Sequence, residues 1–198
     1  MRNLEKELEL KRIQEKIDEL SKERSELFKV LSDIEPQYKD SVIDRLNKLA
    51  NDIFNLEDKI MFVKGPIYNN EYVDIYLDEK NSIHDEHNYL ISRHGCMEII
   101  GHVRLTFDDV TSYLGNIGYS LDKKYRGNGY MIESLRLLKT PLINRNVTKP
   151  VLTVFPDNIS SIKTIKRLGG TLIEPANSEH RCDIYQVDLT SEFEPKKR

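Results

Sequence analysis

The most informative segment of the chain is residues 116–131, Asn116-Ile117-Gly118-Tyr119-Ser120-Leu121-Asp122-Lys123-Lys124-Tyr125-Arg126-Gly127-Asn128-Gly129-Tyr130-Met131. It starts as an extended run over 116–121, passes through a loop with two glycines, and enters an apolar helical stretch with Met131, Leu135, Leu138 and Leu142. A helix N-terminus presents unpaired N–H groups and about half a positive charge. The order strand, glycine loop, helix therefore predicts a turn that binds a phosphate.

Two nucleotide-binding motifs are disfavoured. A phosphate-binding loop of the Walker type requires Gly-Lys-Ser/Thr, which this loop lacks. A dinucleotide fingerprint would place a third glycine where Ile132 stands.

The flanking segments predict a mixed α+β domain. Upstream, Tyr-, Ile- and Val-rich runs predict a meander of antiparallel strands over 71–77, 88–93 and 97–107. Downstream, we expect a strand over 150–155, a helix from Asn158 to about Leu168 closed by Gly169-Gly170, and closing strands over 171–173 and 183–189.

The first 64 residues predict a helical arm. They contain no glycine and one proline, Pro36, which fits the first turn of a second helix. The first half carries a stripe at three- and four-residue steps with Arg24 at one expected apolar position, and the second half carries a regular heptad stripe. These stripes favour an antiparallel hairpin and leave a dimeric coiled coil open. The stripes are Leu10, Ile13, Ile17, Leu20, Leu27, Leu31, Ile34 and Val42, Leu46, Leu49, Ile53, Leu56, Ile60, Val63.

Composition limits the partners. The net charge of −3 gives no general attraction for nucleic acid. The start resembles no signal peptide, and no run approaches the ~18 apolar residues of a membrane span. Two sparse cysteines, Cys96 and Cys182, suit reduced thiols, so we expect a cytoplasmic protein without membrane or nucleic-acid contacts.

Residues 98–174 resemble the GNAT superfamily of acyl-CoA-dependent N-acetyltransferases. The signature Gln/Arg-x-x-Gly-x-Gly/Ala is matched by Arg126, Gly127-Asn128, Gly129 and Tyr130, and further likeness lies in Gly101, 158–161 and Gly169-Gly170. Gly118-Tyr119-Ser120 and Lys163-Thr164-Ile165 look like a bacterial branch of predicted acetyltransferases.

The resemblance implies a site for acetyl-CoA. The N–H groups from Arg126 to Met131 (Arg126, Gly127, Asn128, Gly129, Tyr130, Met131) would hold the pyrophosphate, and the strand backbone at Tyr119 and Leu121 would pair with the pantetheine arm. Asn158 and Ser161 would lie beside the thioester, while Lys123, Lys124 or Arg126 would meet the nucleotide phosphates. No metal is implied.

Three positions depart from the family pattern. Met131 stands where the signature has Gly or Ala, and Ile165 stands where many relatives have a tyrosine that protonates the departing thiolate. A carboxylate near the start of the fourth strand is replaced by Gly115-Asn116.

The candidate catalytic residues are His102 and Arg104, which alternate onto one polar face of the third strand. His102 has the intrinsic pKa of a proton relay, and Arg104 would orient an acidic acceptor.

The combined prediction is a GNAT-like α+β domain over 65–192, with a mostly antiparallel sheet flanked by helices. It is preceded by a helical hairpin or coiled coil over 1–64 and followed by a frayed tail over 193–198. The predicted function is direct transfer of an acetyl group from acetyl-CoA to an unidentified amine. The alternative is a catalytically degenerate acyl-CoA-binding scaffold whose arm docks a partner. A homodimer through the arm remains a further prediction.

Overall fold

The computed structural model describes residues 2–108 and 115–190. The chain divides after Gly65 into two compact units. The predicted tail over 193–198 lies outside the described residues.

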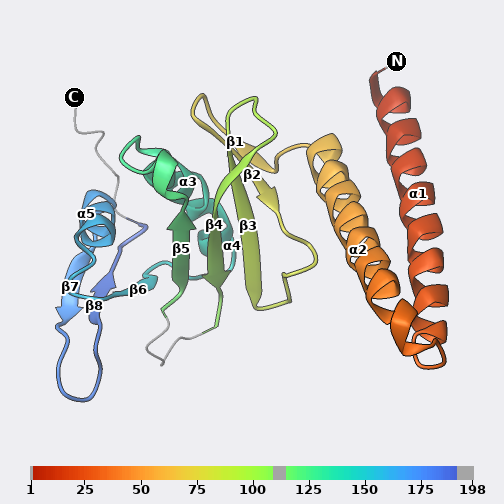
Figure 1. The fold of residues 1–198 in the computed structure, drawn as a ribbon. Helices are drawn as coiled ribbons and strands as arrows, with labels where there is room; N and C mark the ends of the chain where they lie inside the picture. Colours follow the sequence, from red (N-terminus) through yellow and green to blue (C-terminus); the bar gives the residue numbers. More distant parts are fainter. Residues whose placement is uncertain (1, 109–114, 191–198) are drawn as a thin grey trace. The chain divides into compact units, whose positions relative to one another are not determined.

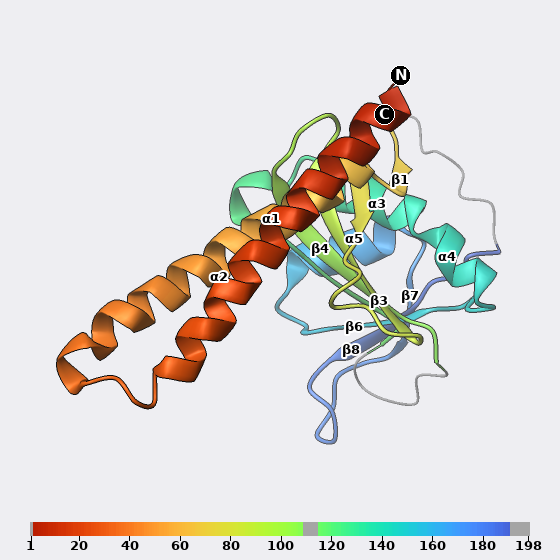
Figure 2. The ribbon, with the colours of Figure 1, turned by 90° about the vertical axis from the view of Figure 1, so that its right-hand side faces the viewer.

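The first unit is an antiparallel helical hairpin. Helix α1 (Arg2–Val30) and helix α2 (Pro36–Lys64) lie side by side and are joined at one end (Figures 1 and 2). Pro36 occupies the first turn of α2, as its missing N–H predicts, and Gly65 follows the helix with a φ of 89°. The hairpin is therefore confirmed, with the apolar stripes of the two helices packed within one chain.

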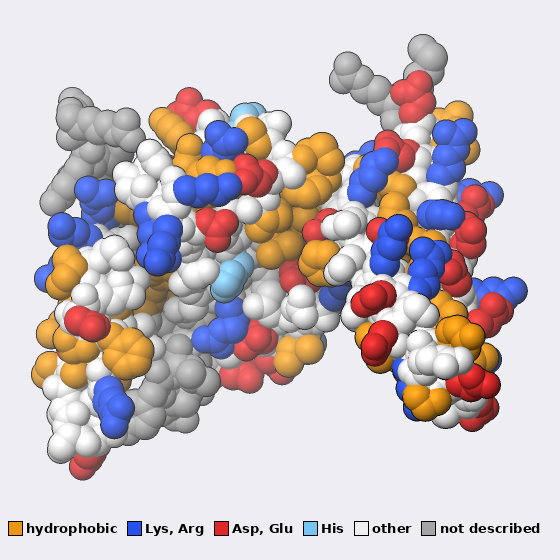
Figure 3. Space-filling view, in the orientation of Figure 1, with side chains coloured by type: hydrophobic (Ala, Val, Ile, Leu, Met, Phe, Trp, Pro, Cys, Tyr) orange, Lys and Arg blue, Asp and Glu red, His pale blue; other side chains and the backbone are white. Residues whose placement is uncertain are grey.

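The core of the hairpin follows the predicted stripes. Ile13, Ile17, Leu20, Leu49 and Ile53 are buried, and Leu27, Leu56, Ile60 and Val63 pack against them. Charged side chains of both signs cover the outer faces of α1 and α2 (Figure 3).

One detail of the stripe differs from expectation. Arg24 is exposed and its guanidinium lies 5.9 Å from the centre of the Phe28 ring, so Arg24 does not interrupt the seam. Glu23 lies nearer the seam and accepts hydrogen bonds from Arg45 of α2 at 2.6 and 2.8 Å. Between Leu20 and Leu27, therefore, the two helices are joined by the ion pair of Glu23 with Arg45.

The second unit begins with a five-stranded antiparallel sheet in the order β1-β2-β3-β4-β5. The predicted antiparallel meander is confirmed. Its strands are β1 (Tyr68–Asn69), β2 (Val73–Leu77), β3 (Glu86–Arg93), β4 (Ile99–Thr106) and β5 (Ile117–Leu121). The short strand β1 was not predicted from the sequence. Strand β3 starts two residues earlier than predicted because Glu86 and His87 pair with Thr106 and Leu105.

The chain then forms a 3-10 turn (Lys123–Tyr125), helix α3 (Tyr130–Leu137) and helix α4 (Lys139–Asn144). The single helical stretch predicted here is wrong in this detail, because the chain leaves helical geometry at Leu138, where ψ is 1°. Strand β6 (Val151–Val154), helix α5 (Ile159–Arg167), β7 (Thr171–Glu174) and β8 (Asp183–Gln186) follow.

The last three strands form a second sheet in the order β6-β8-β7 (Figure 1). One apolar core connects both sheets with α3, α4 and α5. Its members include Val103 and Leu105 of β4, Leu135 of α3, Leu152 of β6 and Ile165 of α5. The α+β fold class is confirmed, and the sheet is divided between β5 and β6.

We predict that Leu49→Ala lowers the local stability of the hairpin by about 2–4 kcal/mol, because it opens a cavity at a fully buried position. Hydrogen exchange of the α1 and α2 amides measures this change. The matched control is Arg24→Ala, which should change exchange little because Arg24 is exposed. Equal effects of the two variants would contradict the proposed core.

Candidate active site

A polar clamp marks the point where the two sheets separate. The Asn116 N–H donates to the Val151 carbonyl at 2.7 Å, and the Val151 N–H donates to Asn116 Oδ1 at 2.9 Å. Asn116 Nδ2 also donates to the Thr106 carbonyl at 3.1 Å. An asparagine supplies both a donor and an acceptor here, which a carboxylate at this position would not do.

Gly115 completes the clamp. Its φ is +67°, and a Cβ atom at this residue would lie 2.7 Å from the Val151 carbonyl oxygen. The departure at Gly115-Asn116 therefore has a structural reason, because only glycine allows the start of β6 to approach so closely. Beyond the clamp, β5 and β6 belong to different sheets.

The backbone of β5 turns its free edge toward this opening. The Asn116 carbonyl accepts from the Thr106 N–H, and the Asp122 N–H donates to the Ile100 carbonyl, so these residues face β4. Because successive residues of a strand direct their backbone groups to opposite sides, Tyr119 and Leu121 present theirs to the opening. The Leu121 carbonyl already accepts a hydrogen bond from Arg126 Nε at 2.8 Å.

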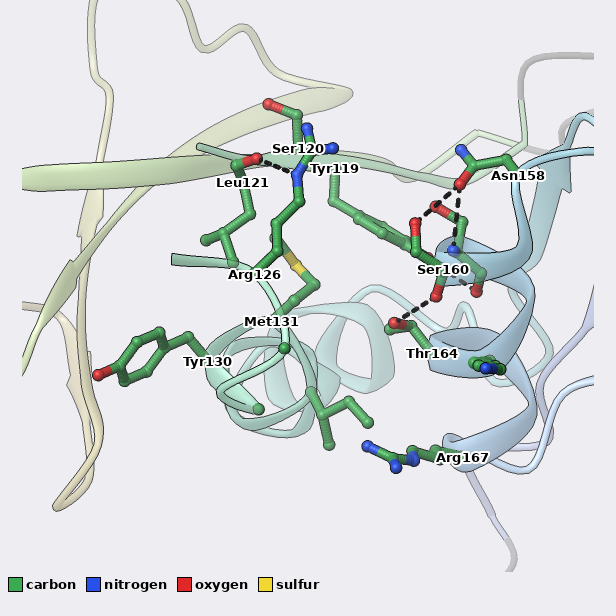
Figure 4. Close-up of a pocket in the computed structure, with 15 residues that line it drawn as sticks. Tyr119, Ser120, Leu121, Arg126, Tyr130, Met131, Asn158, Ser160, Thr164 and Arg167 are labelled. Atoms are coloured by element: carbon green, nitrogen blue, oxygen red, sulfur yellow. Dashed lines mark hydrogen bonds between the residues drawn. The ribbon is translucent and has the colours of Figure 1, made fainter. Parts of the chain in front are cut away.

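A cavity of about 430 Å³ lies at this edge, between β5, the glycine loop, α3 and α5 (Figure 4). It is lined by all the residues predicted to contact the pyrophosphate, the pantetheine arm or the thioester except Asn128, whose side chain donates to the Tyr125 and Arg126 carbonyls. The lining residues shared with the prediction are Tyr119, Leu121, Arg126, Gly127, Gly129, Tyr130, Met131, Asn158 and Ser161.

The glycine loop leads directly to the first turn of α3. Gly127 and Gly129 have φ values of 82° and 86°, which a side chain would strain, and a Cβ at either would meet open space. Gly129 is the N-cap of α3 and makes no side-chain cap, so the first N–H groups of the helix are left to meet another acceptor. This geometry suits an anion.

Met131 does not block the turn. Its side chain is 7% exposed and runs from α3 toward β5, where it joins the core (Figure 4). The Tyr130 ring lies on the side of the α3 N-terminus remote from α5 (Figure 4). At Met131 and Tyr130, therefore, the backbone N–H groups are the groups available to a ligand in the cavity.

The N-terminus of α5 forms the opposite wall. Asn158 is its N-cap, and Asn158 Oδ1 accepts from the Ser161 N–H at 3.2 Å and from Ser160 Oγ at 3.0 Å. The Tyr119 ring extends from β5 toward this wall, and its hydroxyl donates to the Ser161 carbonyl at 3.3 Å (Figure 4). Burial raises the pKa of Tyr119, against the smaller opposing effect of hydrogen bonds to Ser161 and Thr164.

A second hollow of about 370 Å³ continues between the separated strands. Residues of β5, β6 and α5 line it, among them Gly118, Leu152 and Ile165, together with Cys182 just before β8. Tyr119, Asn158 and Ser161 border both this hollow and the cavity at α3. An elongated ligand would therefore pass beside these three residues.

Sequence reasoning missed four residues of α5 that line the cavity. They are Ser160, Lys163, Thr164 and Arg167. Their spacing of three and four residues puts them on one helical face, and this periodicity in a polar helix was the available signal.

The predicted catalytic residues lie outside the cavity lining. His102 is exposed on β4, opposite the face that holds Val103 and Leu105, and its Nδ1 lies 3.2 Å from Ser120 Oγ. Ser120 belongs to the cavity lining, so His102 contacts a lining residue without itself lining the cavity. Arg104 bonds Glu86 at 3.1 Å and Thr106 at 2.9 Å, which ties its guanidinium to its own sheet.

Two predicted phosphate ligands are also placed elsewhere. Lys123 is absent from the cavity lining, within the residues that the structure describes. Lys124 Nζ lies 2.8 Å from Glu98, which also accepts from the Tyr125 hydroxyl. These two hydrogen bonds lower the pKa of Glu98. Arg126 is thus the basic residue of the loop that lines the cavity.

Neither cysteine is in a disulfide. Over residues 2–108 and 115–190, no group of three or more His, Cys, Asp or Glu side chains is arranged to hold a metal ion. None of the described helices is both long and apolar enough to cross a membrane.

Together, the divided sheet, the glycine turn and the cavity between α3 and α5 define a mixed α+β domain with a cavity lined by polar and basic side chains. The profile of the acetyltransferase (GNAT) domain matches residues 43–171, more than half of the chain. The chain belongs to the GNAT acetyltransferase family, which confirms the resemblance seen in the sequence.

Solved structures give distant matches. A domain from Methanocaldococcus jannaschii is 21% identical with a TM-score of 0.45, covering 54% of this chain and 69% of that chain. The ribosomal-protein-S5-alanine acetyltransferase from Vibrio fischeri is 19% identical with a TM-score of 0.45, covering 56% and 65%. An acetyl transferase from Salmonella typhimurium that modifies the N-terminal serine of ribosomal protein L7/L12 is 19% identical with a TM-score of 0.45, covering 71% and 74%. Among curated proteins, the sequence has no match.

We predict that Asn158→Ala makes the α5 amides exchange about fivefold faster, because loss of an N-cap costs about 1 kcal/mol. Asn158→Ser retains a capping oxygen and should leave exchange near the native rate. Hydrogen exchange of residues 159–168 compares the two variants. Equal exchange in both would contradict the capping role.

Proposed function

We propose that this chain is an N-acetyltransferase that moves an acetyl group from acetyl-CoA to an amine by direct transfer. The observation that carries the proposal is the cavity at the opening between β5 and β6, where the N-terminus of α3 and the cation of Arg126 meet. Such a place suits a pyrophosphate, because helix N–H groups and a guanidinium both favour negative charge.

The residues present fit acetyl-CoA. The Arg126 N–H already donates to the Lys123 carbonyl, so the N–H groups from Gly127 to Ile132 would hold the pyrophosphate in place of the predicted Arg126–Met131 set. The backbone groups of Tyr119 and the N–H of Leu121 would pair with the amides of the pantetheine arm, because the Leu121 carbonyl is bound to Arg126. When bound, acetyl-CoA supplies the acyl group as a thioester, and CoA leaves as the thiol. The hollow beside Gly118 and Leu152 extends the cavity toward the far side of the sheet, where an amine would enter.

Proton transfer can be assigned to groups of this chain. Formation of the C–N bond releases a proton from the amine, and cleavage of the C–S bond requires one at sulfur. Tyr119 Oη holds a proton between β5 and α5, and its raised pKa keeps it protonated at neutral pH. His102 with Ser120 is the candidate acceptor of the amine proton. Backbone N–H groups of β5 would stabilise the oxyanion.

The alternative is a domain that binds acyl-CoA without turnover. It is favoured by Ile165, which is 1% exposed and belongs to the apolar core, so this position of α5 supplies no acid. Turnover of acetyl-CoA with a panel of amines separates the two functions. An acetylated product with any acceptor would exclude the alternative, and binding without product would support it.

We predict that Gly129→Glu weakens acetyl-CoA binding about a hundredfold or more, because it places negative charge against the pyrophosphate. Calorimetry of the full chain measures the dissociation constant. Gly129→Ala carries the strain of a positive φ without bulk or charge, and Gly129→Gln carries the bulk without charge. The expected order of affinity is native, Ala, Gln, Glu. A native protein that does not bind acetyl-CoA would overturn the proposal.

We predict that Tyr119→Phe lowers kcat about tenfold to a hundredfold and leaves the KM for acetyl-CoA nearly unchanged. This decrease in kcat is small for the loss of a general acid, because a thiol is a good leaving group. The matched control is Tyr125→Phe, whose hydroxyl binds Glu98 away from the cavity. A steady-state assay of both variants compares kcat with KM. An unchanged kcat in Tyr119→Phe would show that Tyr119 does not protonate the departing CoA sulfur.

A further inference from the structure

Helix α5 carries a cationic face that the pyrophosphate site does not use. We propose that Lys163 and Arg167 form a subsite for the 3′-phosphate of the CoA adenosine, and that the cavity thereby selects 3′-phosphorylated acyl-CoA over the dephospho form. This inference rests on the proposed function, because it concerns the same cavity.

The charge of the lining supports an anion with several phosphates. Arg126, Lys163 and Arg167 line the cavity, whereas no Asp or Glu does so in the described part of the chain. The whole chain carries a net charge of −3, so this accumulation of positive charge is local. CoA has two separate anionic groups, the pyrophosphate and the 3′-phosphate. One cation site is therefore available for each.

Lys163 and Arg167 are available for a ligand. Neither makes an ion pair or a side-chain hydrogen bond within residues 2–108 and 115–190. Helix α5 itself, Ile159–Arg167, contains no Asp or Glu. Two like charges one turn apart repel each other, so their placement without a counter-ion works against the helix. A bound phosphate would reverse the sign of that interaction.

The helix dipole accounts for only one member of this pair. Cations near a helix C-terminus are favourable, which explains Lys166 and Arg167 in the last turn of α5. Lys163 lies before that turn, and Lys166 does not line the cavity. The Arg167 guanidinium extends from α5 toward the N-terminus of α3 (Figure 4). Lys163 and Arg167 therefore share a place in the cavity lining, and not a position in the last turn of the helix.

The division of the phosphates follows from the two walls. The glycine loop and α3 supply backbone N–H groups on one wall, where a pyrophosphate would be held closely. Lys163 and Arg167 stand on the other wall as exposed side chains, which suit a terminal phosphate that remains partly solvated. Arg126 belongs to the first wall because its Nε is bound at the end of β5.

The test is calorimetry of the full chain with acetyl-CoA and with 3′-dephospho-acetyl-CoA. We expect native protein to bind acetyl-CoA about tenfold or more tightly than the dephospho form, because charge-assisted contacts to phosphate are lost. In the double variant Lys163→Ala, Arg167→Ala, affinity for acetyl-CoA should fall to the level of the dephospho form, whose own affinity should not change. Alanine favours a helix, so α5 should persist, and circular dichroism verifies it.

The matched control is Lys166→Ala, which removes a cation from the same helix outside the cavity and should keep the native preference. Equal binding of the two ligands by native protein would overturn the inference. So would a double variant that keeps the preference or loses affinity for both ligands alike. In each of these cases acetyl-CoA still binds and the proposed function stands, whereas failure of native protein to bind either ligand would overturn both.

Discussion

The opening of the sheet depends on the clamp between Asn116 and Val151. Two hydrogen bonds join the starts of β5 and β6, and the Asn116 side chain adds a bond to the Thr106 carbonyl on the preceding strand. Asn116 is 5% exposed, so these bonds are made away from water, where an unpaired polar group is costly. Because the clamp holds only one end, the strands can separate beyond it while the base of the two sheets stays fixed. The separation of the two strands leaves one edge of β5 unpaired and makes room for the hollow beside β6.

The positive charge of the cavity comes from the placement of a few basic side chains and not from the net charge of the chain. The chain is slightly acidic, yet acidic side chains are kept from the cavity lining in the described residues. Two acidic residues instead bind groups outside the cavity lining: Glu98 binds Lys124 and the Tyr125 hydroxyl, and Glu86 binds Arg104. These pairings decide which cations remain for a ligand. They also explain why Lys124 of the loop and Arg104 on the polar face of β4 do not contribute to the cavity lining.

The sequence allowed prediction of those features that depend on local patterns. Hydrophobic periodicity located both arm helices, and the glycine turn located the α3 N-terminus, since positive φ at Gly127 and Gly129 is a local requirement. The break at Leu138 and the strand β1 escaped prediction because they depend on packing and pairing with distant residues. His102 was placed on the correct face of β4, but its distance from the cavity depends on the sheet register, which periodicity does not give. Lys163 and Arg167 were missed because only the fold shows which face of α5 borders the cavity.

The proposed proton donor, Tyr119, illustrates how packing limits the chemistry that this domain can perform. Ile165 is almost completely buried and packs against Gly170, where an added Cβ would collide with its side chain. A tyrosine at this position would need space that the junction of α5 and the following turn does not have. Tyr119 instead projects from β5 into the same region, and its hydroxyl reaches the Ser161 carbonyl on α5. The hydroxyl thus enters from the strand, across the opening that the ligand would occupy. Because Tyr119 belongs to β5, the clamp at the start of this strand would fix the position of the proposed proton donor as well as the edge proposed to bind the ligand.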